Sequence, residues 1–326
     1  MLLNLLEYHW VEDIDEALLL LARPDVKTIP LAGGTHLLGL DDDSIQAVVD
    51  LRDLELAYIH EDAASVHIGA MTTLQSMVDA PLLKELAVGT LARAAQASSF
   101  SRVIRNSATL GGTLAIGAAS QADVLTVLAA LDAEALLRSA SRTRIDLSGG
   151  TVERPGFALA GVTVKGKQER RVSCVNLSIE RRSNELIIEV IIARPAAGAG
   201  MSFQRIGRTP TDIALLNACA LVEIDDGVYS CVRLALGGVN MEPVRMHVVE
   251  RQLAGQTAMN PGGTTLNTQL LVSALQAGMA NFQPPADFRA SSGYRKISGV
   301  NLAFRALEEA TSIARWRNMV SSKERQ

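Results

Sequence analysis

Hydrophobic and polar positions follow two different periods along this chain, and the switches between them predict its elements. From residue 13 to residue 22, apolar side chains recur every three or four positions, acidic residues fill the first turn and a proline follows. We expect a helix there. The run KTIPLA (27–32) predicts a strand that ends at two glycines, and IQAVVDL (45–51) predicts a second β-rich segment. The first part of the chain therefore predicts a small α/β unit built around the glycine turn.

The pattern changes from residue 65 onward, where a β-like run is followed by helical periodicity. Pro81 opens a predicted helix whose apolar face includes Leu83, Leu86, Thr90 and Ala94. A second glycine pair lies within residues 105–123, and apolar residues at helical spacing after it predict a further helix. These features predict an α+β unit.

The stretch PAAGAG (195–200) is the best candidate for a linker, because small and flexible residues separate compact units. Beyond it, residues 212–224 and 229–239 are apolar runs that fit either a helix or a strand. Residues 300–316 predict a terminal helix with Ala303, Leu307, Ala310 and Ala314 on one face, and residues 317–326 predict a polar tail. We place a domain boundary in the linker.

The amino-acid composition excludes several classes of binding partner and cofactor. The chain has 326 residues, 48% of them hydrophobic and 20% charged, which fits two or three compact soluble units. With 31 basic and 35 acidic residues it offers no electrostatic reason to bind nucleic acid or an anionic membrane. Three scattered cysteines are too few for a disulfide framework or a cluster of four thiolates, and they suggest a reducing cytoplasm. We expect neither a signal peptide nor a membrane span.

Two four-residue patterns share one form, AGGT at 32–35 and LGGT at 110–113. Consecutive glycines can turn several backbone N–H groups toward one point, and such a nest holds an anion. Neither turn carries the lysine of a phosphate loop, and G-x-G-x-x-G is absent from the sequence. Two such turns fit a diphosphate held between loops by backbone donors and threonine hydroxyls, as in a dinucleotide. A single Gly-Gly turn more often closes a hairpin, so spacing alone leaves both interpretations open.

Longer segments around these turns carry a family resemblance. PLAGGTHLL (30–38) and VIRNSATLGGTLAIGAASQAD (103–123) are similar to the two flavin loops of the FAD-binding medium subunit of the molybdenum hydroxylases, the xanthine and carbon monoxide dehydrogenase group. Further similar segments are NELIIEVIIARP, FQRIGRTPTDIALLNACA, GGVNMEPVRMHVVERQLAG and YRKISGVNLAFRALEEA, in the family's order. The resemblance implies an α+β fold. It consists of an FAD domain of the vanillyl-alcohol oxidase type (1–197, with parts 1–53 and 54–197) and a C-terminal α+β domain (198–316).

The resemblance also implies a set of cofactor-binding residues. Those expected around the FAD are Ala32, Gly33, Gly34, Thr35, His36, Leu37, Thr109, Gly111, Gly112, Thr113, Asp123, Ile188 and Phe203. The two glycine loops would face the pyrophosphate from opposite sides. Asp123 would accept a hydroxyl hydrogen bond and so orient the cofactor, and Ile188 and Phe203 would lie by the flavin ring.

The sequence departs from the family pattern at three places. Thr113 stands where many members have Asn or Ser, which keeps a hydroxyl but loses an amide donor. The segment after the first loop is shorter than usual and acidic. Gln204 replaces a lysine of some members, which leaves Arg205 as the nearest cation. Arg102 and Arg105 flank the second turn, where they could neutralise phosphate or pair on the surface.

Other chemistries lack their motifs. The five histidines show no paired-ligand spacing and no serine-hydrolase elbow occurs, so we expect no metal site and no catalytic side chain of the chain's own. The resemblance implies a subunit that passes electrons from the Fe–S clusters of a partner through FAD to NAD or another acceptor. Its partners would be a molybdopterin-binding large subunit and a 2Fe-2S small subunit. Two alternatives remain, a stand-alone flavin oxidase of the same fold and a scaffold subunit that has lost FAD.

Overall fold

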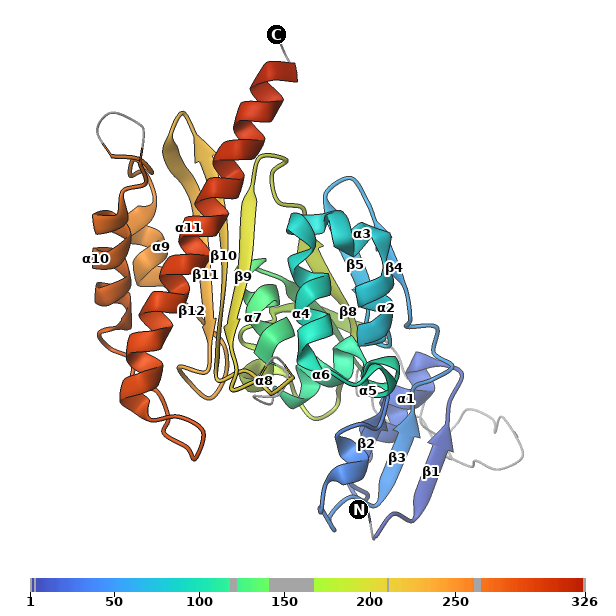
Figure 1. Cartoon of the computed structure of the whole chain (residues 1–326). Coiled ribbons are helices and arrows are strands. Elements are labelled where there is room, and N and C mark those ends of the chain that lie inside the picture. Colours follow the sequence, from blue (N-terminus) through green and yellow to red (C-terminus); the bar gives the residue numbers. More distant parts are fainter. Residues whose placement is uncertain are drawn as a thin grey trace.

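Three β-sheets follow one another in space in the order of the chain (Figure 1). The structure is a computed structural model that describes residues 2, 4–117, 122–140, 167–209, 211–260 and 265–324. The N-terminus lies in the first lobe, while the last helix extends past the third sheet at the other end of the molecule (Figure 1). Residues 118–121 of the second glycine segment lie outside the described residues.

The N-terminal lobe is a three-stranded parallel sheet covered by one helix. Its elements are β1 (Glu7–Trp10), α1 (Ile14–Leu21), β2 (Thr28–Leu31) and β3 (Ala47–Asp50), with strand order β1-β3-β2. The predicted helix is confirmed, and Asp13 caps it by accepting a hydrogen bond from the N–H of Asp15. β1 was not expected, because four residues that expose every second side chain carry little hydrophobic signal.

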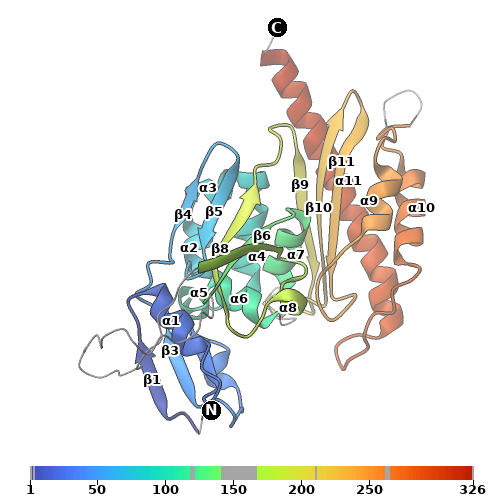
Figure 2. The same ribbon diagram turned by 180° about the vertical axis from the view of Figure 1, so that it is seen from behind.

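The central part is a five-stranded antiparallel sheet with helices against one face. Its strands are β4 (Ile59–Glu61), β5 (Ser65–Gly69), β6 (Glu134–Ala140), β7 (Lys167–Ser173) and β8 (Glu185–Ala193), in the order β4-β5-β8-β6-β7. Figure 2 shows this sheet from the side opposite to α2 (Leu74–Asp79) and α4 (Thr90–Ser98). Val66 and Ile68 point from the sheet into the core that these helices complete.

The helix expected from Pro81 is interrupted. The structure has α3 (Pro81–Glu85), a short 3-10 turn η2 (Leu86–Gly89) and then α4. Ala87, Val88 and Gly89 all have positive φ, at 48°, 62° and 69°, which no continuous helix allows. The apolar spacing persists across the break because Leu83, Leu86 and Leu91 all reach the same core, so periodicity alone could not reveal it.

The remaining helices of the central part surround the second glycine pair. They are α5 (Arg102–Ser107), α6 (Leu110–Ile116), α7 (Ala122–Ala130) and the short α8 (Leu177–Glu180). All nine residues of α7 are buried, since this helix contacts α4 on one side and strands of the third sheet on the other. α7 is thus the shared wall between the central part and the C-terminal part.

The C-terminal part is a four-stranded antiparallel sheet between α7 and the last helix. Its elements are β9 (Gly200–Ile206), β10 (Leu216–Asp225), β11 (Val228–Gly237), β12 (Val244–Arg245), α9 (His247–Leu253), α10 (Thr268–Met279) and α11 (Ser292–Glu324). Both runs that fitted helix or strand are therefore strands. Along β10, Cys219 and Leu221 join the central core, whereas Ala218 and Ala220 join the core under α11.

The last helix differs in length from its expected range. Ala303, Leu307, Ala310 and Ala314 are fully buried, which confirms the predicted face. The helix is longer than predicted, because α11 begins at Ser292 and continues through Glu324, into the segment predicted as a polar tail. Polar composition misled the prediction, since a helix end that extends past its sheet needs no apolar stripe. Within the described residues, no helix has the length and apolar character needed to cross a bilayer.

Candidate functional site

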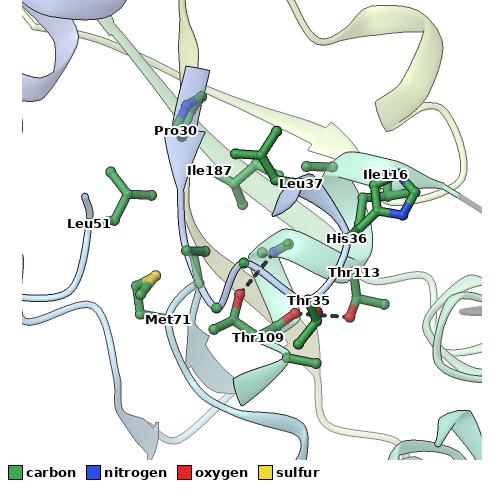
Figure 3. Close-up of a pocket in the computed structure, with 18 of the residues that line it drawn as sticks. Pro30, Thr35, His36, Leu37, Leu51, Met71, Thr109, Thr113, Ile116 and Ile187 are labelled. Carbon is green, nitrogen blue, oxygen red and sulfur yellow. Dashed lines mark hydrogen bonds between the residues drawn. The ribbon is translucent and has the colours of Figure 1, made fainter. Parts of the chain in front are cut away.

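A cavity of about 320 Å³ lies where the N-terminal lobe meets the central part. The segment after β2, the start of α6 and the beginning of β8 all contribute to its wall. Both glycine turns line it, although 76 positions separate Gly34 from the first residue of α6, Leu110. The expectation that the two turns share one site thus agrees with their placement. Figure 3 shows His36 and Ile116 toward one end of this cavity and Leu51 and Met71 toward the other.

The first glycine turn presents a row of backbone donors. In the part of the chain that the structure describes, the consecutive N–H groups of residues 33–37 have no hydrogen-bond acceptor. Gly34 has φ 69°, a left-handed conformation that favours glycine. The row runs into a 3-10 turn, η1 (Leu37–Gly39), whose N-terminus has no side-chain cap. Such a set of unpaired N–H groups fits an anionic group of a ligand.

The two turns are in direct contact through the end of α5. A Cβ atom built on Gly33 would lie 1.6 Å from the backbone oxygen of Ser107 and 2.5 Å from its carbonyl carbon. On the other side, a Cβ atom on Gly111 would lie 2.8 Å from the Cβ atom of Ala70. Glycine is required at both positions, because the Ser107 carbonyl group fills the side-chain space at Gly33 and the Cβ and carbonyl oxygen of Ala70 fill it at Gly111. This close packing fixes the distance between the two loops.

The second glycine turn is the first turn of α6 and not a second row of free donors. The N–H of Gly111 donates to Ala70 O at 2.8 Å, and the N–H of Gly112 donates to Thr109 Oγ1 at 3.1 Å. The N–H of Thr113 donates to Thr109 O at 2.9 Å. The expectation of free main-chain donors is therefore met at the first turn alone. At the second turn, the Thr109 hydroxyl caps the helix as an acceptor and keeps its own O–H to donate (Figure 3).

The rest of the cavity wall is mostly apolar and was not predicted. Ile29, Pro30, Leu51, Met71 and Ile187 line it. These residues come from four separate segments, and each has the apolar character of a core residue, so no spacing marks them in the sequence. Apolar walls with a few convergent polar groups are typical of sites that bind an organic cofactor.

Two charged residues line the cavity beside the apolar ones, Arg181 and Glu185. Glu185 is 2% exposed, and Arg170 binds it through two contacts, Nε to Oε1 at 2.8 Å and NH2 to Oε2 at 2.9 Å. The hydrogen bonds from Arg170 lower the pKa of this carboxyl, although burial acts against them. No carboxylate among the described residues is paired with Arg181 in this way. Sequence reasoning missed Arg181 because it lies in a polar turn with no motif around it.

Ten of the thirteen residues expected around the cofactor line this cavity. They are Ala32, Gly33, Gly34, Thr35, His36, Leu37, Thr109, Gly111, Gly112 and Thr113. The other three do not line it. Ile188 is buried beneath the N-terminal lobe, next in the chain to the lining residue Ile187, and Phe203 packs against the central core. Asp123 is 2% exposed at the start of α7.

The Asp123 carboxylate is held by the C-terminal sheet. Its Oδ1 accepts from Asn217 Nδ2 at 2.6 Å, and its Oδ2 lies 3.3 Å from Arg205 NH2. Asn217 Oδ1 in turn accepts from the hydroxyl of Thr126, one turn further along α7, at 2.7 Å. Burial raises the pKa of Asp123, while Arg205 and Asn217 act in the opposite direction. This buried cluster joins α7 to β9 and β10.

The other cations near the second turn serve the fold. Arg105 donates to the carbonyls of Ser99 and Phe100 and, through Nε, to Gln75 Oε1 at 2.9 Å. Arg102 is exposed, and its nearest carboxylate, that of Asp79, is 4.0 Å away. Neither arginine lines the cavity. Among the residues that the structure describes, no three His, Cys, Asp or Glu side chains are grouped to hold a metal ion.

Comparisons with known proteins identify the family of both parts of the chain. Residues 4–148 match the family model described as the FAD binding domain in molybdopterin dehydrogenase, and residues 201–310 match the CO dehydrogenase flavoprotein C-terminal domain. The chain is 26% identical to the glyceraldehyde dehydrogenase medium chain of Sulfolobus acidocaldarius, over 93% of this chain and 97% of that protein. It is 26% identical to the carbon monoxide dehydrogenase medium chain of Hydrogenophaga pseudoflava, over 93% and 96% of the two chains.

Solved structures share the fold. A carbon monoxide dehydrogenase structure from Hydrogenophaga pseudoflava aligns with a TM-score of 0.79 and 24% identity, over 96% of this chain and 99% of the other. A quinoline 2-oxidoreductase structure from Pseudomonas putida 86 aligns with a TM-score of 0.75 and 23% identity, over 95% and 98%. The fold therefore consists of an FAD-binding domain followed by a CO dehydrogenase flavoprotein C-terminal domain, as the resemblance implied.

Proposed function

This chain belongs to the FAD-binding medium-chain subunits of the molybdenum hydroxylase family, and we propose that it is the electron-transfer subunit of such an enzyme. In this role, electrons pass from a molybdopterin-binding large subunit to the Fe–S clusters of a small subunit, and from these clusters to the FAD of this chain. The chain then passes them to NAD or another acceptor. The observation that carries the proposal is one cavity lined by both glycine turns, in a chain whose two parts match the two family models.

FAD fits the cavity on three grounds. The unpaired N–H groups of residues 33–37 supply donors for a diphosphate, the apolar wall suits flat rings, and Gly33 leaves the space that a side chain would fill. We assign the diphosphate to the first turn together with the hydroxyls of Thr35 and Thr109. When bound, FAD supplies the redox chemistry, and this chain's residues bind it, orient it and keep water from it.

The role of Thr109 gives a specific prediction. Thr109→Val removes both the cap acceptor for Gly112 N–H and a hydroxyl donor toward the cavity. We expect it to destabilise the chain by about 1 kcal/mol, the usual contribution of an N-cap. We also expect it to weaken FAD binding by about 10-fold, because one hydrogen bond to a charged group is lost. Thermal unfolding and fluorescence titration with FAD measure the two effects, and Thr109→Ser, which keeps the hydroxyl, should restore both.

Domain limits and location follow as further assignments. We assign residues 1–197 to the FAD-binding domain and residues 198–316 to the C-terminal domain, with the boundary in the connection between β8 and β9. We assign the cytoplasm as the location. The reason is that the three cysteines, all within the described residues, are free, as is usual for proteins kept in a reducing compartment.

Reduction of the purified chain tests the proposed function. The chain should be yellow, and organic substrates such as purines or aldehydes should leave its flavin oxidised when it is alone. A chemically reduced 2Fe-2S small subunit, freed of excess reductant, should bleach the flavin under anaerobic conditions. Bleaching by an organic substrate without partners would favour the stand-alone oxidase, and a colourless chain that fails to take up FAD would favour the scaffold.

A further inference from the structure

Arg181 lies at the cavity wall between α8 and β8. Its backbone N–H donates to Leu177 O at 2.9 Å and closes the short helix α8. Four residues later, Glu185 begins β8 and lines the same cavity. The position of Arg181 is thus fixed from both sides, by the end of a helix and by the start of a strand, and its side chain is half-buried.

The guanidinium of Arg181 has few internal partners. Its NH1 reaches the backbone oxygen of Glu185 at 3.4 Å. Within the described residues, no carboxylate lies within 4.0 Å of it, because the nearby Glu185 side chain is taken by Arg170 and by the N–H of Arg182. A guanidinium has five N–H donors, so most of those on Arg181 remain available to a ligand.

The surroundings of Arg181 make an unpaired cation costly. Burial lowers the pKa of Arg181, which means that the charged form has lost hydration, and the charge of Glu185 compensates in part. A half-buried cation without an ion-pair partner is stabilised when an anion binds beside it. The first glycine turn offers N–H donors but no charge, and the other arginines near the turns lie outside the cavity wall.

These observations point to one assignment. We propose that Arg181 is the cation that neutralises the diphosphate of FAD. The backbone N–H groups of residues 33–37 donate hydrogen bonds but carry no charge. This inference depends on the proposed function in one respect, that FAD occupies this cavity. A guanidinium is well suited to the task, because its planar donors bind phosphate oxygens in pairs. Glu185 positions Arg181 through its backbone oxygen, while its carboxylate stays bound to Arg170.

The test compares two adjacent arginines in the full-length chain after FAD removal. Arg181→Gln should weaken FAD binding by about 30-fold, the effect of one charge-assisted contact to phosphate. It should also reduce the salt dependence of binding. Arg182→Gln is the matched control, because Arg182 is exposed and its side chain does not line the cavity, and it should bind FAD as the wild type does. Arg181→Lys keeps the charge and should recover most of the affinity.

Fragments of FAD show which part of the cofactor the Arg181 side chain contacts. ADP should compete with FAD on the wild type and lose the same factor in Arg181→Gln, whereas riboflavin and adenosine, which lack phosphate, should bind both proteins equally. Equal FAD affinities of the Arg181→Gln and Arg182→Gln variants would overturn the assignment. So would a loss for adenosine as large as that for ADP, which would mean that the guanidinium stacks on the adenine.

Two further measurements keep the outcome interpretable. Thermal unfolding of each variant without FAD shows whether it is folded. If Arg181→Gln does not fold, two measurements still test the role of Arg181: the FAD affinity of Arg181→Lys, and the salt dependence of wild-type binding to FAD compared with riboflavin. A Gly33→Ala variant separates this inference from its premise. If Gly33→Ala leaves FAD affinity unchanged, FAD is not in this cavity. If Gly33→Ala weakens binding while Arg181→Gln does not, FAD is in the cavity and the role of Arg181 is wrong.

Discussion

Gly33→Ala should weaken FAD binding by at least about 100-fold, equivalent to about 2.8 kcal/mol. The new methyl carbon would lie 1.6 Å from Ser107 O and 2.5 Å from the Ser107 carbonyl carbon. Because both are backbone atoms at the end of α5, no side-chain rotation relieves the overlap. The loop that carries the free N–H groups must move away from α5, and the spacing between the two glycine turns is lost.

Gly39 provides the matched control for this substitution. It lies six positions further along the same loop, in η1, and a Cβ atom built on it meets no other atom within 4 Å. Gly39→Ala should therefore bind FAD like the wild type. Fluorescence titration of the two variants, together with circular dichroism to establish that both are folded, makes the comparison. Equal affinities of the two variants for FAD would mean that FAD does not occupy this cavity.

Local sequence was sufficient to predict the first glycine turn and its neighbours. A β-like run that ends in two glycines dictates a sharp turn, and in the structure this turn carries the unpaired N–H groups. The second turn shows the limit of that reasoning. Gly111 and Gly112 lie in a helix, so their donors are used by Ala70 and Thr109, and the glycines are there for close packing. The same dipeptide thus has two physical roles that sequence alone does not separate.

Residues that depend on long-range contacts were the hardest to predict. Arg181 and Met71 reach the cavity because strands distant in sequence meet there, and nothing in their own neighbourhoods marks them. The break at Ala87 was hidden for a related reason, since the apolar spacing continues on both sides of a turn with positive φ. Asp123 matched the family pattern by position, but its partners are on strands that follow it by more than eighty residues.

Arg205→Leu should destabilise the folded chain by about 3 kcal/mol at neutral pH, the lower end of the cost of removing one partner from a buried ion pair. The Asp123 side chain is 3% exposed and that of Arg205 is 18% exposed, so water cannot replace the lost cation. Arg208 is the matched control on the same segment. Its pair with Asp212 is 3.1 Å long but its side chain is 57% exposed, so Arg208→Leu should change the stability by about 0.5 kcal/mol or less.

The pH dependence identifies Asp123 as the origin of the effect. Burial already raises the pKa of its carboxyl above the ordinary 3.8, and loss of the Arg205 charge raises it further. A carboxyl whose pKa is higher in the folded state than in the unfolded state favours folding at low pH, and this contribution is lost as the pH rises through the folded-state pKa. The stability deficit of Arg205→Leu should therefore be largest at neutral pH and shrink on mild acidification, where the protonated carboxyl needs no cation. Denaturant unfolding of both variants across this pH range measures it, and a deficit that stays constant with pH would mean that Arg205 acts through packing alone.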